Sequence, residues 1–371
     1  MAVYLDNAAT TAVLPEAAQA ALAVMTENYG NPSSLHEAGR AARETLEKAR
    51  AAVALALGCP AACVTFTSCG TESINTSLVG AAMKNRHRGR HIISTAIEHD
   101  AVLRTLNDLK NQDFEVTLIL PERDGTVSLD KVLSAVRPDT ILMSMQGVNN
   151  ETGALLPYAE AAAAFKKSNP EGLFHLDGVQ NFLKRPMPLK NVDLASCSAH
   201  KIGGMKGCGA LYIRPGLKLR PLLFGGGQES AMRSGTEGMP QIAAFAAAVE
   251  KRLPAVEENG RHMASLKNEL IARVRALGGT INTPERSADH IVNLSMCRGR
   301  SEVYIRALSD DGVYVSGGSA CARGKKSHVL DAMHLPKRNI DAALRVSFCP
   351  ENTMDDVESF CASLEKAAKL F

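Results

Sequence analysis

The chain has 371 residues, of which 45% are hydrophobic and 22% are charged, and its formal net charge at pH 7 is +3. A chain of this length exceeds the usual size of one compact domain, so two domains are expected. The small net charge, and the lack of a long basic run with interleaved aromatic residues, argue against direct nucleic-acid or membrane-surface binding and favour small-molecule chemistry.

The start of the chain, residues 1–7, has neither a basic segment nor an apolar core, and no stretch reaches the roughly 20 apolar residues of a membrane span. We therefore expect a cytoplasmic protein. The nine cysteines are odd in number, irregularly spaced and without a C-x-x-C pair. Cys59 and Cys63 lack a second pair of ligands, so no metal site is predicted and reduced thiols are expected.

Apolar periodicity predicts amphipathic helices over residues 15–25 and 39–57. Short apolar runs predict strands at residues 64–67, 91–94, 115–119, 140–144, 173–177 and 194–197. Their alternation with helical stretches indicates an α/β fold, a mostly parallel sheet flanked by helices, with ligands outside the carboxyl ends of the strands. A long helical region from Met239 past Pro254 marks a boundary. We predict a large domain over 13–255 and a smaller α+β domain formed by 1–12 and 256–371.

Two reactive side chains stand out. Lys201 follows a run of small, nearly uncharged residues, 194–200, and precedes a glycine-rich turn. Burial would favour its free amine, which condenses with an aldehyde such as pyridoxal phosphate; a solvated loop lysine is the alternative. Cys321 lies in a small-residue segment, 316–326, with three cations just after it, which raise the thiolate fraction of a thiol. Together the two residues predict sulfur chemistry on a cofactor-bound substrate.

Other polar residues also follow predicted strands. The turn 68–73 opens a helix whose free N–H groups and dipole suit a phosphate, to which Thr71 adds a hydroxyl; an ordinary helix cap is the alternative. Asp177 needs a cationic partner, either the pyridine nitrogen of the cofactor or, as the alternative, the start of a following helix that it caps. His99 is placed to cover the cofactor ring and relay protons, or is a solvated loop histidine.

The remaining candidates are hydrogen-bonding groups and one cation. Asn150 and Gln180 are candidate partners of the cofactor ring, Gln180 for its phenolic oxygen. Ser198 and His200, which flank Lys201 in sequence, are candidates for the phosphate. Arg345 lies among small residues on one face of a predicted strand, where its planar guanidinium suits the carboxylate of an amino acid. An exposed strand arginine is the alternative.

Taken together, these motifs resemble the cysteine desulfurases of the class V aminotransferase group, which are fold type I pyridoxal phosphate enzymes. The resemblance runs nearly end to end, through residues 4–11, 29–34, 67–72, 98–99, 149–153, 175–180, 198–201, 233–237 and 318–321. It implies a pyridoxal 5'-phosphate enzyme that takes sulfur from L-cysteine, giving L-alanine and a persulfide on Cys321. The persulfide would pass to a sulfur-acceptor protein, either an iron–sulfur scaffold or a tRNA-thiolation protein.

The resemblance also implies a role for each candidate. Lys201 would form the Schiff base, and His99 would stack on the ring and share proton transfer with Lys201. Cofactor contacts would come from Gly70, Thr71, Asn150, Asp177, Gln180, Ser198 and His200, and substrate contacts from Asn31 and Arg345. In this family the Arg-Ser-Gly-Thr segment reaches the other subunit, so Thr236 is expected to complete the phosphate site of the partner in an obligate homodimer.

Two features depart from the family pattern. Cys69 stands where the family commonly has glycine, and the segment between Cys321 and Arg345 is short and lysine-rich, which leaves the sulfur acceptor open. Selenocysteine lyase activity shares the cofactor and fold and stays open as an alternative. A low-turnover docking scaffold for sulfur transfer is another, against which the intact catalytic set argues. A third is an aminotransferase, against which Cys321 on its glycine loop argues.

Overall fold

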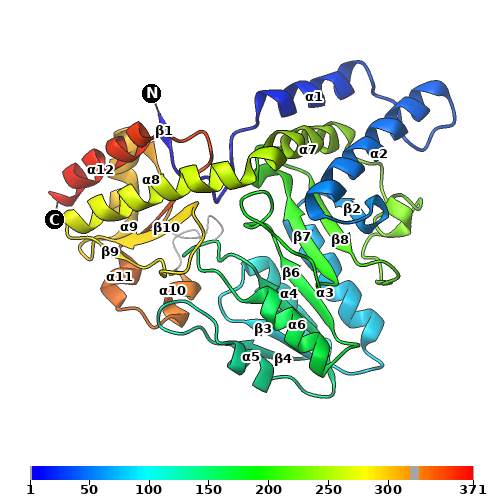
Figure 1. The fold of residues 1–371 in the computed structure, drawn as a ribbon, viewed down its shortest axis with the longest axis horizontal. Helices are drawn as coiled ribbons and strands as arrows, with labels where there is room; N and C mark the ends of the chain where they lie inside the picture. The colour runs from blue at the N-terminus through cyan, green and yellow to red at the C-terminus, as the bar shows by residue number, and fades with distance from the viewer. Residues whose placement is uncertain (1, 318–325, 371) are drawn as a thin grey trace.

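A seven-stranded sheet organises most of the molecule in the computed structural model, which describes residues 2–317 and 326–370. Its strands are β2 (Val64–Thr67), β3 (His91–Thr95), β4 (Glu115–Ile119), β5 (Thr140–Gln146), β6 (Leu173–Asp177), β7 (Leu194–Ser198) and β8 (Gly209–Ile213). They lie in the order β2-β8-β7-β6-β5-β3-β4 (Figure 1). β8 is antiparallel to both of its neighbours, and the other pairs are parallel.

Helices cover both faces of this sheet (Figure 1). On one face lie α3 (Gly70–Asn85) and α4 (Asp100–Lys110), and the core of the other face includes α2 (Glu37–Leu57), α5 (Leu129–Ser134), α6 (Tyr158–Ser168) and α7 (Met239–Arg252), with α1 (Pro15–Thr26) packed on α7. Successive strand residues alternate between the two cores: Ile92 and Leu142 join the first, and Ile93 and Met143 the second. Burial of both faces explains why the strands are continuous apolar runs.

After α7, helix α8 (Val256–Ala276) leads into a smaller unit and packs on its core. This unit contains a sheet of order β12-β10-β9 and a parallel pair, β1 with β11. Its elements are β1 (Val3–Tyr4), β9 (Thr280–Ile281), β10 (Ile291–Ser295), α9 (Ser301–Asp310), β11 (Val313–Tyr314), α11 (Lys337–Asp341), β12 (Ala343–Ser347) and α12 (Met354–Ala368). The short helix α10 (His328–Ala332) instead packs Val329 and Leu330 into the core of the large sheet. A hydrophobic core of its own, which includes Leu344, Val346 and Phe348, supports a separate small domain. The exact boundaries at residues 12 and 255 stay a prediction.

The expected α/β architecture is confirmed. All six predicted strands are present, and their ends differ from the prediction by at most two residues. In the seven-stranded sheet the sequence analysis missed β8, which begins at Gly209 directly after a glycine-rich turn. The helical region predicted from Met239 is two helices, α7 and α8, separated by a 3₁₀ turn at Leu253–Ala255. Pro254 in that turn has no backbone N–H to continue the α-helical hydrogen bonds.

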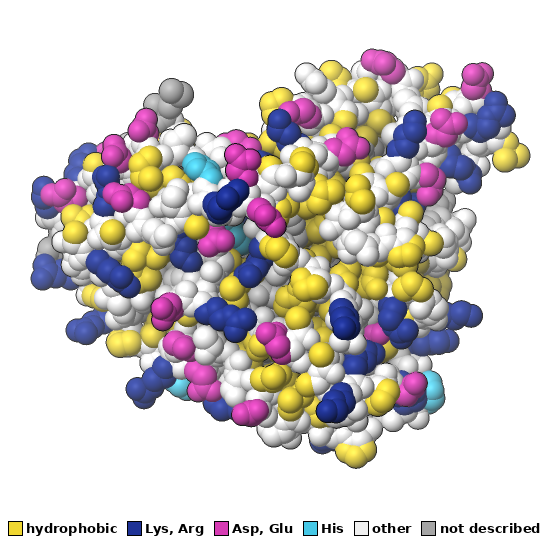
Figure 2. Space-filling view, in the orientation of Figure 1, with side chains coloured by type: hydrophobic (Ala, Val, Ile, Leu, Met, Phe, Trp, Pro, Cys, Tyr) yellow, Lys and Arg dark blue, Asp and Glu magenta, His cyan; other side chains and the backbone are white. Residues whose placement is uncertain are grey.

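The surface carries charges of both signs. On the face in Figure 2, Lys and Arg side chains are interspersed with Asp and Glu, and no continuous basic area forms. This face therefore offers no extended electrostatic surface for a polyanion. Within the described parts of the chain, no helix combines the length and the apolar character needed to cross a lipid bilayer.

Candidate active site

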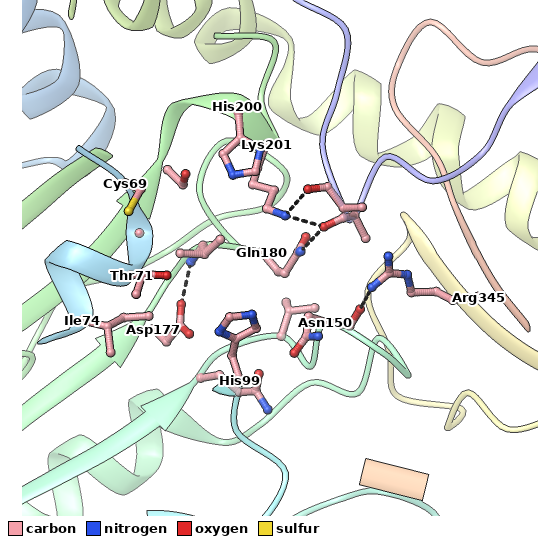
Figure 3. A pocket seen from close by; sticks show the side chains of 17 residues that line it. Cys69, Thr71, Ile74, His99, Asn150, Asp177, Gln180, His200, Lys201 and Arg345 are labelled. Carbon is pink, nitrogen blue, oxygen red and sulfur yellow. Dashed lines mark hydrogen bonds between the residues drawn. The ribbon is translucent and has the colours of Figure 1, made fainter. Parts of the chain in front are cut away.

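Most of the predicted site residues meet in one cavity of about 220 Å³. The loops that follow β2, β3, β5, β6 and β7 reach it, because the carboxyl ends of parallel strands meet at one edge of the sheet. The N-terminal segment and β12 contribute further lining residues. The predicted residues that line the cavity are Gly70, Thr71, His99, Asn150, Asp177, Gln180, Ser198, His200, Lys201 and Arg345 (Figure 3).

Lys201 ends a 3₁₀ turn, Ala199–Lys201, directly after β7. Its Nζ donates hydrogen bonds to the carbonyl oxygens of Ala8 and Ala9, each at 2.6 Å (Figure 3). The amine is therefore anchored on the cavity wall rather than in solvent, which excludes the solvated loop lysine. These hydrogen bonds join Lys201 to the N-terminal segment, almost two hundred positions away in the sequence.

Asp177 ends β6 and is 5% exposed. Its Oδ1 accepts a hydrogen bond from the backbone N–H of Val179 at 3.1 Å. Burial nevertheless raises the pKa of this carboxyl to about 6, against the opposing effects of that hydrogen bond and of the nearby Lys201. The residues after Asp177 form turns, so the alternative of a helix cap is wrong. A cationic ligand group facing Asp177 would restore its charged form.

His99 caps α4 and lies in the cavity (Figure 3). Its Nδ1 accepts a hydrogen bond from the backbone N–H of Ala101 at 3.0 Å, which assigns the ring hydrogen to Nε2. Burial, followed by the positive charge of Lys201, lowers the pKa of His99 to about 4. The imidazole is therefore neutral at physiological pH, a state suited to stacking on a flat ring and to hydrogen bonding through Nε2–H.

One end of the cavity suits an anion. α3 begins there at Gly70, where a Cβ atom would lie 2.8 Å from Cγ2 of Val179, so a side chain could not fit without a shift. Thr71 occupies the first turn. The hydroxyl of Ser198 is buried and has no hydrogen-bond partner among the described residues. Burial and the charge of Lys201 lower the pKa of His200 to about 3. A helix N-terminus with an unbonded hydroxyl beside it fits a phosphate group.

Arg345 lies on β12 and is 1% exposed, so the alternative of an exposed strand arginine is wrong. Its Nη2 donates to Oδ1 of Asp6 at 2.7 Å, and its Nη1 donates to the carbonyl oxygen of Asn150 at 2.9 Å. Within the described part of the chain, neither Nε of Arg345 nor Oδ1 of Asn150 has a hydrogen-bond partner, although both are buried. The guanidinium is thus held in one orientation. Its Nε–H can donate to a ligand carboxylate, and Oδ1 of Asn150 can accept a hydrogen bond from a ligand.

Two predicted residues lie outside the cavity, and a third is not described. Asn31 is exposed, and its Oδ1 accepts a hydrogen bond from the backbone N–H of Ser33 at 2.8 Å. Thr236 is also exposed and lines a separate hollow that includes Arg233. Cys321 falls in 318–325, outside the described residues. A single chain therefore does not bring Asn31 or Thr236 to the cavity.

The sequence analysis missed several groups around the site. Cys69 lines the cavity directly before α3, although it was flagged only as a departure from the family pattern. Glu98 is fully buried beside His99, and burial raises its pKa to about 8. The carbonyl oxygens of Ala8 and Ala9 carry no residue signature, because every residue has one. The sequence signal that could have pointed to these carbonyls is that residues 4–11 are one of the motifs shared with the family.

Comparison with known proteins extends these observations. The family "Aminotransferase class-V" matches residues 3–360. "Cysteine desulfurase IscS" of Methanosarcina thermophila is 41% identical over 363 residues, which cover 96% of this chain and 89% of that protein. "Putative cysteine desulfurase IscS 1" of Bacillus subtilis (strain 168) is 36% identical over 365 residues, 96% of each chain.

The fold comparison agrees. A solved structure titled "NIFS-LIKE PROTEIN" superposes with a TM-score of 0.95 at 39% sequence identity, and the alignment covers all of both chains. The resemblance predicted from the sequence motifs is confirmed, and so is the fold, that of a fold type I pyridoxal phosphate enzyme. The chain belongs to the class-V aminotransferase family.

Proposed function

We propose that this protein is a pyridoxal phosphate-dependent cysteine desulfurase, which converts L-cysteine to L-alanine and retains the sulfur as a persulfide on Cys321. The observation that carries the proposal is the cavity in which Lys201, Asp177 and Arg345 meet. An amine, a buried carboxylate and a buried guanidinium suit, respectively, the aldehyde and the ring nitrogen of the cofactor and the carboxylate of an amino acid. The reaction itself is inferred from the two relatives, both of which are named cysteine desulfurases.

The cavity offers groups that fit both the phosphate and the ring of pyridoxal phosphate. The N-terminus of α3, with the Ser198 hydroxyl beside it, suits the phosphate. Within the same cavity the Asp177 carboxylate, whose pKa burial raises, suits a protonated ring nitrogen, and Gln180 and Asn150 suit the ring oxygen. When bound, the cofactor supplies an electron sink for the bonds of the substrate Cα atom.

The residues of this chain then bind and move protons. Arg345, held by Asp6, binds the substrate carboxylate and so fixes the orientation of the amino acid. The amine of Lys201 accepts and returns the proton at the substrate Cα atom. Neutral His99 would lie against the ring of the bound cofactor, and we assign it a share in the same proton transfer.

Sulfur transfer requires a nucleophile, and Cys321 is the thiol we assign to it. Its thiolate attacks the substrate sulfur, so that an S–S bond forms and the C–S bond of the substrate breaks. The electron pair of the broken bond stays with the three-carbon fragment, which takes up a proton and leaves as alanine. The step needs no external oxidant, because the sulfur atom is oxidised as the carbon fragment is reduced.

We further propose a homodimer. Asn31 and Thr236 lie on surface segments that also expose large apolar side chains: Tyr29 is 77% exposed, Leu35 90% and Phe224 72%. Apolar and aromatic side chains exposed in this way are typical of protein interfaces. A second copy that covers them would bring Thr236 to the phosphate end of the partner's cavity and Asn31 to bound substrate.

The sulfur acceptor is proposed to be a protein in the cytoplasm that serves iron–sulfur cluster assembly or tRNA thiolation. The IscS name of the two relatives supports the first of these two roles. Transfer of radiolabelled sulfur from the persulfide to a purified scaffold or thiolation protein distinguishes the two. Labelling of neither protein would contradict this part of the proposal.

The test of the function is the Cys321→Ala variant. We expect it to bind the cofactor with an unchanged visible absorption band and to lose sulfide release from L-cysteine in the presence of a thiol reductant. Cys59→Ser is the matched control, because Cys59 is a partly buried thiol that does not line the cavity. Undiminished sulfide release by Cys321→Ala would refute the assigned nucleophile.

The same assay addresses two of the three alternatives, selenocysteine lyase activity and a docking scaffold. A kcat/KM for L-selenocysteine that far exceeds a negligible value for L-cysteine would replace the proposal by selenocysteine lyase activity. Cofactor binding without turnover of either amino acid would support a docking scaffold. We expect turnover of L-cysteine.

A further inference from the structure

Two consecutive threonines of the N-terminal segment hold His200, the residue before Lys201. Oγ1 of Thr10 lies 3.1 Å from Nδ1 of His200. Thr11 donates to the carbonyl oxygen of His200 from its backbone N–H at 2.9 Å and from its hydroxyl at 3.1 Å. The hydroxyl oxygen of Thr11 in turn accepts a hydrogen bond from the backbone N–H of Gly203 at 2.9 Å. Both the ring and the backbone of His200 are therefore tied to the N-terminal segment.

The backbone of Thr10 is itself held in place. Its N–H donates to the carbonyl oxygen of Asp6 at 3.4 Å, and its carbonyl oxygen accepts a hydrogen bond from the hydroxyl of Tyr4 at 3.1 Å. Asp6 is fixed in turn by its ion pair with Arg345. Among the residues that the structure describes, the ring of His200 is the one hydrogen-bond partner of the Thr10 hydroxyl. The fold of the N-terminal segment thus places this hydroxyl against Nδ1.

The ring of His200 is neutral. Burial, followed by the positive charge of Lys201, lowers its pKa to about 3, so at physiological pH the imidazole has one donor and one acceptor nitrogen. Which nitrogen carries the hydrogen is set by the partner of the other one. A hydroxyl can donate to Nδ1, and the ring hydrogen then lies on Nε2.

This arrangement matters for an anion in the cavity. His200 lines the cavity (Figure 3), and because Nδ1 is turned to Thr10, Nε2 is the nitrogen left for a ligand. A phosphate dianion only accepts hydrogen bonds, so His200 can bind it as a neutral ring only with the hydrogen on Nε2. With the hydrogen on Nδ1, the ring would instead turn a lone pair toward the phosphate.

We propose that Thr10 is a positioning residue, whose hydroxyl donates to Nδ1 of His200 and so keeps the ring hydrogen on Nε2, which donates it to the phosphate of the cofactor. The inference rests on the proposed cofactor site. It adds the N-terminal segment to the groups that hold the phosphate, beside the start of α3 and the hydroxyl of Ser198. The same segment bonds the amine of Lys201 through the carbonyl oxygens of residues 8 and 9.

The first test is nitrogen NMR of the cofactor-loaded protein with isotope-labelled histidine rings, in which the His200 signals are assigned by their loss in His200→Ala. We expect the hydrogen on Nε2 and a hydrogen-bonded acceptor at Nδ1. Thr10→Val should move the Nδ1 signal toward that of an acceptor without a donor, and Thr10→Ser should return it. A hydrogen on Nδ1 in the wild type would overturn the inference, and this readout stands even if a variant does not fold.

The second test is the affinity for pyridoxal phosphate, measured by fluorescence titration. Thr10→Val has nearly the same shape but no hydroxyl, and we expect its Kd to rise about 5- to 10-fold, whereas Thr10→Ser should stay within about 2-fold of the wild type. Thr26→Val is the matched control, because the hydroxyl of this exposed threonine bonds the carbonyl oxygen of Leu22 outside the cavity. Its Kd should not change.

A double-mutant cycle shows whether Thr10 acts through the ring. In a His200→Ala background, Thr10→Val should weaken cofactor binding no further, since the group that it positions is gone. The same loss of affinity in both backgrounds, or a lower melting temperature with an unchanged Kd, would show a purely structural role and overturn the inference. A wild-type protein that acquires no lysine-linked absorption band would instead overturn the proposed cofactor site itself.

Discussion

Replacement of Asp177 by asparagine should act in opposite directions on the cofactor-free and the cofactor-loaded protein. Without the cofactor, the carboxyl is 5% exposed and its charge is poorly compensated, so burial raises its pKa from 3.8 to about 6. Asparagine has nearly the same shape, can keep an acceptor for the Val179 N–H, and carries no charge. The variant therefore removes the free-energy cost of burying this charge, which destabilises the cofactor-free protein.

The size of this stability change follows from the pKa shift of Asp177. A pKa of about 6 in the folded state against 3.8 is a difference of about 2 units, or about 3 kcal/mol at pH 7. The folded-state pKa is the higher one, so the cost is absent below pH 3.8, grows as the pH rises to about 6 and is constant above it. Asp177→Asn should stabilise the cofactor-free protein by up to about 3 kcal/mol at pH 7.5, and by roughly half as much at pH 5.

Chemical denaturation of the cofactor-free proteins at the two pH values measures this difference. Asp310→Asn, at an exposed aspartate, is the control for loss of a surface charge. A variant no more stable than the wild type at pH 7.5, or equally stabilised at both pH values, would refute the reasoning. In the loaded enzyme the same variant loses the partner of the ring nitrogen, and we expect turnover to fall at least about 100-fold.

Two further substitutions test the ends of the cavity. Gly70→Ala places a Cβ 2.8 Å from Cγ2 of Val179, and we expect weaker cofactor binding by roughly 1–3 kcal/mol in a fluorescence titration, with little change if the helix start is not part of the site. Arg345→Gln leaves Asp6 without its ion-pair partner and should destabilise the fold by about 2–4 kcal/mol and raise KM for L-cysteine. Adding Asp6→Asn should recover stability in denaturation experiments but not KM, and recovery of both would contradict the carboxylate-binding role.

The strand ends could be predicted because each is a local pattern. Apolar runs such as residues 64–67 and 173–177 place Gly70 and Asp177 at the edge where parallel strands end, so their proximity follows from topology. The antiparallel strand β8 could not be read in the same way. Its five residues, Gly209–Ile213, begin with glycine, and only the neighbours β2 and β7 on either side make them a central strand.

Contacts between distant segments could not be predicted from local pattern. The ion pair of Arg345 with Asp6 joins the first strand region to β12, and the bonds from Lys201 reach backbone carbonyls that any residue would offer. Electrostatics were also hidden, because the state of His99 depends on burial and on the distance to Lys201 rather than on its neighbours in sequence.

The measurement that tests the central claim most directly is single-turnover persulfide formation on the purified, cofactor-loaded protein. L-cysteine is added at substoichiometric amount, and the peptide that carries Cys321 is analysed by mass spectrometry together with released alanine. The account predicts a peptide heavier by one sulfur atom and an equal amount of alanine. Alanine without the sulfur-bearing peptide, or no alanine at all, would contradict it.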